Sequence, residues 1–121
     1  YLAVAVGGAA GAVLRFWMAF GLNVWAGAAF PMGTFAVNVL GSILMGVLAA
    51  LFQAHTEWPA EVRYALVVGL LGSFTTFSTF SMDVLALMLG GEFGRAMLYV
   101  VLSVVLCVTG CALGFFGMRA I

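Results

Sequence analysis

Apolar residues fill four long blocks of this chain, and three short joints between them hold both prolines and half of the charged residues. The blocks run at about Leu2 to Leu22, Gly33 to Ala54, Val62 to Leu89 and Ala96 to Met118. Each is close to the ~20 residues that a helix needs to cross a bilayer. The joints are Asn23 to Met32, His55 to Glu61 and Gly90 to Arg95, and such short connections favour antiparallel neighbours. We therefore predict an all-α membrane protein, with residues 1–121 forming a single four-helix transmembrane domain.

Polar residues interrupt the third block in an unusual way. Between Thr75 and Ser81, five of seven residues carry hydroxyl groups and the other two are phenylalanines. Polar side chains at membrane depth usually face a bundle interior or a water-filled path. Gly69, Gly72 and the threonines lower helix propensity here, and irregular backbone is tolerated in a membrane only where it is buried in protein or lines a cavity. We predict a break in the third helix that presents hydroxyls, carbonyls and aromatic edges to an ion.

Small residues recur at a spacing of four along all four blocks. The pairs are Gly7 and Gly11, Ser42 and Gly46, Gly69 and Ser73, and Gly110 and Gly114. Because lipid supplies no hydrophobic drive between helices, such faces are typical of backbones that pack closely.

Composition excludes several classes of protein. The chain is 66% hydrophobic and 7% charged, whereas a soluble domain carries about 25% charged residues. Four scattered arginines form no basic patch, so we expect no nucleic-acid partner. We find no catalytic constellation and predict that the chain is not an enzyme; His55 and Glu57 are expected to be a solvated pair. Cys107 and Cys111 are expected to pack as free thiols, like small hydrophobes.

The ends of the chain and its charges bear on insertion. The chain begins with Tyr1, so we expect its natural start to be trimmed, and the first block lacks the basic leader and cleavage site of a signal peptide. With four spans, Arg63 and Arg119 lie on one side of the membrane, and Arg15 and Arg95 lie toward the other. This two-to-two division has no positive-inside bias, which favours insertion in both orientations.

Three polar residues have alternative interpretations. Asn38, midway along the second block, offers two amide donors; it either joins helices or serves the polar stretch of the third block. Arg15 either extends to the interface or attracts anions at a pore mouth. Asp83, at the end of the hydroxyl stretch, either pairs with an arginine or lines a vestibule.

Aromatic and hydroxyl side chains suggest an anion path. Phe77 and Phe80 are one helical turn apart, and the edge of an aromatic ring carries the positive end of its quadrupole. Tyr99, Ser103 and Cys107 share one face of the fourth helix and could complete a polar track. Taken by itself, Ser103 is expected to bond back to its own helix.

Together these motifs match a family. The chain resembles the Fluc (CrcB) fluoride channels over essentially its whole length, through GGAAGAVLRF at 7–16, GTFAVNVLGS at 33–42, GSFTTFSTFS at 72–81 and the face that holds Tyr99 and Ser103. The resemblance implies a dual-topology homodimer of antiparallel subunits in the inner membrane of a prokaryotic cell. It also implies two fluoride pores and passive export of fluoride, which lowers its cytoplasmic concentration and confers fluoride resistance.

The resemblance assigns residues to these roles. It places Asn38, Phe77, Phe80, Tyr99 and Ser103 along the fluoride pores, and the hydroxyls of Ser78, Thr79 and Ser81 belong to the same predicted set. The backbone carbonyls of Gly72 and Thr75 would bind a structural sodium ion at the dimer interface. Arg15 and Asp83 are vestibule candidates, although the family usually has glutamate at the position of Asp83. Cys107 stands where some members have serine.

Two rival functions remain. A proton-coupled small multidrug transporter also uses four spans and antiparallel dimers, but it needs a carboxylate within the membrane, and Asp83 is the only candidate. The third hypothesis is a membrane subunit without transport activity.

Overall fold

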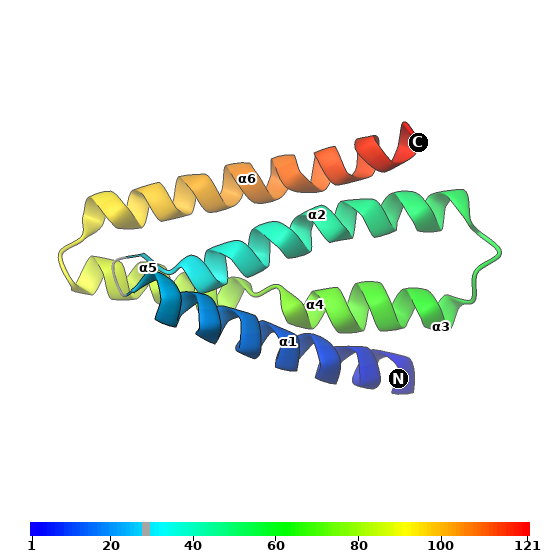
Figure 1. Ribbon diagram of the computed structural model, residues 1–121, viewed down its shortest axis with the longest axis horizontal. Helices are drawn as coiled ribbons and strands as arrows, with labels where there is room; N and C mark the ends of the chain where they lie inside the picture. Colours follow the sequence, from blue (N-terminus) through cyan, green and yellow to red (C-terminus); the bar gives the residue numbers. More distant parts are fainter. Residues whose placement is uncertain (28–29) are drawn as a thin grey trace.

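A computed structural model of the chain describes residues 1–27 and 30–121, and long helices lie side by side in it (Figure 1). The elements are α1 (Leu2–Ala26), α2 (Met32–Ala54), α3 (Ala60–Arg63), η1 (Tyr64–Leu71), α4 (Gly72–Phe74), α5 (Phe77–Leu89) and α6 (Phe93–Arg119). They form four spans that are long and apolar enough to cross a membrane, because α3 to α5 follow one another within the third. No strand occurs in either described range. The prediction of an all-α membrane protein with four spans is confirmed.

The joints are shorter than predicted. We expected the first helix to end near Leu22, but α1 continues to Ala26 and ends at Gly27, whose φ of 82° suits glycine. Asn23 stays inside the helix, and its Oδ1 accepts a hydrogen bond of 2.9 Å from the backbone N–H of Gly33, one of the otherwise unpaired donors at the start of α2. The other joints reduce to 55–59 and 90–92. Residues 28–29 of the first predicted joint lie outside the described residues.

Glycines hold the helices in two close pairs, α1 against η1 and α2 against α6. A Cβ atom on Gly7 would collide with the backbone carbonyl of Ala65, and one on Gly46 would collide with that of Cys111. The close helix packing predicted from the small residues is therefore present within one chain.

The buried core is small, and much of the apolar surface faces outward. Val37, Leu71 and Phe74 form a buried cluster where α2, η1 and α4 meet. Both termini and the joint between α2 and α3 lie at the same end of the bundle (Figure 1). The exposed apolar surface suits lipid or a second protein.

The third span changes conformation four times. The segment η1 is a π-helix, a form that in short pieces is frequent at functional sites. After α4 the backbone is extended at Thr75 (ψ 154°) and at Thr76 (φ −152°, ψ 120°), and α5 begins at Phe77. We refer to Thr75 and Thr76 as the extended pair.

Candidate functional site

The extended pair lies at the end of α4 and immediately before the start of α5. The backbone N–H and the hydroxyl of Thr75 both donate to the carbonyl of Leu71, at 3.0 and 2.9 Å. The hydroxyl oxygen of Thr76 accepts a bond of 3.2 Å from the backbone N–H of Thr79, which is the usual cap of a helix N-terminus. The threonines thus satisfy part of the backbone that the change in conformation exposes.

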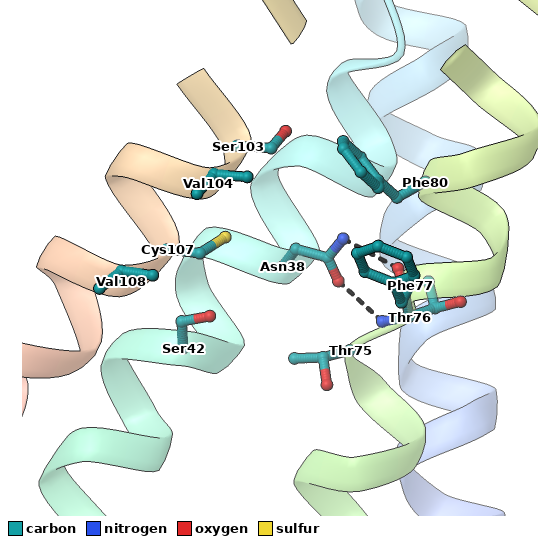
Figure 2. Close-up of a pocket in the computed structure, with 10 residues that line it drawn as sticks. All are labelled: Asn38, Ser42, Thr75, Thr76, Phe77, Phe80, Ser103, Val104, Cys107 and Val108. Carbon is teal, nitrogen blue, oxygen red and sulfur yellow. Dashed lines mark hydrogen bonds between the residues drawn. The ribbon is translucent and has the colours of Figure 1, made fainter. Parts of the chain in front are cut away.

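Asn38 fixes the extended pair from the neighbouring helix α2. Its Nδ2 donates to the carbonyl of Thr76 at 3.0 Å, and its Oδ1 accepts from the backbone N–H of Thr76 at 2.7 Å (Figure 2). The amide therefore joins helices, as one of our two interpretations held. Because Nδ2 carries two hydrogens, a second donor remains, and it has no recorded partner in the described part of the chain.

Arg15 reaches the same region from α1. Its Nε donates to the carbonyl of Ser73 at 2.9 Å. This carbonyl lies in the short helix α4, whose C-terminal end carries partial negative charge. The side chain is bound to the protein and does not extend freely to the interface; its vestibule role stays a prediction.

A cavity of about 290 Å³ lies beside the extended pair. Its lining residues are Asn38, Ser42, Thr75, Thr76, Phe77, Phe80, Ser103, Val104, Cys107 and Val108 (Figure 2). The structure thus brings together four predicted pore residues from α2, α5 and α6. No charged side chain lines the cavity, which has room for several water molecules. We did not predict a role for Ser42, although it follows Asn38 by four residues and helical spacing places both on one face.

Ser103 contradicts one expectation. Its hydroxyl is buried, with the residue 5% exposed, and has no hydrogen-bond partner among the described residues. It does not bond back to its own helix as expected, whereas Ser81 does so, donating to the carbonyl of Phe77 at 3.0 Å. An unpaired buried hydroxyl is unfavourable, so this side chain is suited to a ligand in the cavity.

Tyr99 lies next to the cavity but does not line it. The side chain is fully buried, with its ring centroid 5.0 Å from that of Phe80. Its hydroxyl donates to Oδ2 of Asp83 at 3.1 Å. Asp83 therefore pairs with tyrosine and not with an arginine, and it also lines a second cavity of about 540 Å³.

Other predicted pore hydroxyls lie outside the cavity lining. The oxygens of Ser78 and Thr79 each lie 3.2 Å from the hydroxyl oxygen of Thr76, within hydrogen-bonding distance. Ser78 and Ser81 are exposed on the surface of the single chain. A pore role for these residues stays a prediction.

The carbonyls predicted to bind sodium differ from their neighbours. Those of Ser73 and Thr76 accept side-chain hydrogen bonds, from Arg15 and Asn38. For the carbonyls of Gly72 and Thr75, no hydrogen bond is recorded within residues 1–27 and 30–121. Oxygen atoms in this situation are suitable ligands for a hard cation.

At the far end of the bundle, His55 and Glu57 form the expected exposed pair, with Nδ1 and Oε1 3.2 Å apart. A backbone hydrogen bond and the bond with His55 lower the pKa of the Glu57 carboxyl. No group of three or more His, Cys, Asp and Glu side chains capable of holding a metal occurs among the described residues.

The fold and the site define a multi-pass membrane protein with a largely apolar cavity between its helices, into which hydroxyl and amide groups project and which no charged side chain lines. The family model described as "CrcB-like protein, Camphor Resistance (CrcB)" matches residues 2–115. The chain belongs to this family, as the resemblance implied.

Several bacterial relatives support this membership, and each bears the name "Fluoride-specific ion channel FluC". The protein of Rhodospirillum centenum is 52% identical over 114 residues, covering 93% of this chain and 90% of its own length. That of Nitrobacter winogradskyi is 45% identical over 120 residues, covering 99% and 95%. That of Methylococcus capsulatus is 50% identical over 112 residues, but this chain spans only about half of its length, 49%.

Proposed function

We propose that this chain forms a fluoride channel in the inner membrane of a bacterium and lets fluoride leave the cytoplasm down its electrochemical gradient. The relatives' names support this function. The observation that carries it is the buried, unpaired hydroxyl of Ser103 in a cavity that also holds the amide of Asn38. Neutral hydrogen-bond donors can replace part of the hydration shell of a small anion. Because no cationic side chain lines the cavity, the anion is not bound there too tightly to leave.

The test of this function is flux from liposomes. Purified protein is expected to release fluoride rapidly and to exclude chloride, because the predicted track of aromatic and hydroxyl side chains is narrow and no charged side chain lines the cavity. A fluoride electrode and a chloride electrode measure the two rates in parallel, with empty liposomes as the control. Comparable chloride release would contradict the proposal. Proton-driven transport of an organic cation would favour the multidrug transporter, and no transport of any kind would favour the non-transporting subunit.

The functional unit is proposed to be a homodimer of antiparallel subunits. Phe77 lines the cavity yet is 77% exposed in the single chain, so the cavity is incompletely enclosed by one copy. A two-fold axis would bring the same surface of a second copy against it. Arg63 ends α3 and Arg119 ends α6, near the joint after α2 and the C-terminus, whereas Arg95 lies at the start of α6 and Arg15 lies in the second half of α1. This division has no bias that would orient every copy alike.

Both orientations are therefore expected to coexist in the membrane. A single cysteine replacing Glu92 in the joint before α6, on a background without Cys107 and Cys111, should react with an impermeant thiol reagent partly from each side. Cysteine at Thr56, in the joint at the opposite end, is the matched control and should give the complementary fractions. Labelling of each position from one side only would contradict dual topology.

A sodium ion is proposed to bind where two copies meet, on the carbonyls of Gly72 and Thr75 from each. Two carbonyls are too few for the ligand shell of a hard cation, and a symmetric pair of chains raises their number to four. Gly72 is exposed on the single chain, which leaves it accessible to a second copy. A Cβ atom at Gly72 would meet only the carbonyl oxygen of Val67, at 3.6 Å, which is an ordinary van der Waals distance.

Fluoride flux is expected to be lost when the dimer is prepared with a large organic cation in place of sodium, and to return when sodium is restored. Gly72→Val should weaken dimerisation, because its new side chain finds space within the chain but not at the proposed contact. Gly117→Val is the control, since a Cβ atom at Gly117 has open space. Unchanged flux without sodium, together with normal assembly of Gly72→Val, would contradict the cation site.

A further inference from the structure

Two thiols on α6 have no ligand assigned to them in the proposed function. Cys107 and Cys111 are free and partly buried, and they are four residues apart on a continuous helix. Cys107 lines the cavity, and its sulfur points toward the side of the cavity that holds Asn38 (Figure 2). The spacing places the two side chains one above the other on one face of α6.

The cavity wall beside Cys107 has an unsatisfied polar group. Ser103 lies one turn before Cys107 on the same face of α6, and its buried hydroxyl has no partner in the part of the chain that the structure describes. This part of the cavity is therefore suited to a ligand that is not part of the chain. The same opening gives a small ligand a route to the sulfur of Cys107.

We propose that Cys107 and Cys111 together bind a soft divalent metal ion, of which Hg(II) is the representative, and that the bound metal obstructs the cavity. Two S–H bonds break and two S–Hg bonds form, the two protons pass to water, and no atom is oxidised or reduced. The Cβ atoms of residues at this spacing lie about 5–6 Å apart. Two metal–sulfur bonds of about 2.3 Å each, as in zinc sites, span a similar distance.

Charge and softness together select the metal. Thiolates prefer soft ions, whereas hard ions prefer oxygen. A divalent ion on two thiolates is neutral, so no net charge is buried at membrane depth; a monovalent ion such as Ag(I) would leave one negative charge, which is unfavourable there. Zn(II) usually takes four ligands, and the described residues offer no larger cluster of ligating side chains. The expected order of retention is Hg(II), then Ag(I), then Zn(II).

The test measures metal retention and fluoride flux separately. Purified protein is loaded with Hg(II) and washed with an excess of glutathione, a monothiol that strips mercury from single thiols more readily than from a chelating pair. Wild-type protein is expected to retain one Hg(II) per chain and to lose its flux to the level of empty liposomes, and a dithiol should restore it. Cys107→Ser, Cys111→Ser and the double variant should each lose the metal and keep their own untreated rates.

Each contrary outcome has a definite meaning. Retention of Hg(II) by either single variant would overturn the paired site, and alanine at the same positions repeats the test should a serine variant fold poorly. Retention without loss of flux would overturn the obstruction. The flux consequence rests on the proposed function, but retention does not. Untreated wild-type protein that passes no fluoride would therefore contradict the channel while leaving the metal site fully testable.

Discussion

Replacing Phe80 with isoleucine is expected to suppress fluoride flux strongly while the chain stays folded. Phe80 is only 8% exposed, lines the cavity and packs at a tilt against Tyr99 and Phe77, with centroid distances of 5.0 and 5.4 Å. Isoleucine keeps most of the bulk but removes the positive ring edge. If that edge stabilises a dehydrated anion by about 2 kcal/mol, comparable with a cation–π contact in a desolvated site, flux falls roughly thirtyfold.

The same substitution at Phe77 separates the effect of the ring edge on flux from the effect of ring packing on stability. Phe77→Ile should also impair flux, but with little effect on the stability of a single chain, because the ring is largely exposed. Phe93→Ile, at an exposed position near the start of α6, is the control and should conduct normally. Flux and thermal unfolding are measured on all three variants. Normal conduction by both Phe77→Ile and Phe80→Ile would mean that the rings serve only in packing and that their edges do not stabilise the anion.

Local patterns in the sequence were enough to predict the spans and to group some of the side chains that line the cavity. Block length predicts four helices, and small residues four apart predict where backbones approach. Side chains from three helices, including Asn38 and Ser103, do meet at one cavity. The predictions worked where a single helix face carried the information, because helical periodicity is a local property of the chain.

Contacts between distant residues could not be predicted in the same way. Arg15 bonds to Ser73 across 58 positions, and Asn38 bonds to Thr76 across 38. Such partners depend on which helices pack together and in what register, and neither is encoded by spacing within one block. The extension of α1 past Asn23 has a similar cause, because the side chain of Asn23 finds its partner on the next helix. The π-helical hydrogen bonding of η1 has no composition signal of its own.

These distant contacts give the cavity its rigidity. Arg15 from α1 and Asn38 from α2 hold the two sides of the extended pair, and the threonines cap their own helices. The backbone at this point is therefore constrained from three directions, as donors for a dehydrated anion need to be. Unlike Arg15, Asn38 also lines the cavity.

Replacing Asn38 with leucine is expected to abolish flux and to destabilise the protein. Leucine has similar size but leaves the N–H and carbonyl of Thr76 without their partner, and each unsatisfied buried group costs about 1–3 kcal/mol. The remaining amide donor is lost as well. A hydrogen bond to a charged group contributes about 1.5–3 kcal/mol, so its loss alone slows flux roughly ten- to a hundredfold.

Asn38→Asp separates the effect on flux from the effect on stability. A carboxylate still accepts a hydrogen bond from the N–H of Thr76, but it supplies no amide donor and repels an anion. Its flux should be as low as that of Asn38→Leu, while its thermal stability should fall less. Gln53→Leu removes an exposed amide near the end of the same helix and should leave both properties unchanged. Should Asn38→Leu unfold earlier while the surviving protein conducts at the normal rate, Asn38 would act only by joining α2 to the extended pair. The anion would then have to be held by Ser103 and the aromatic rings without it.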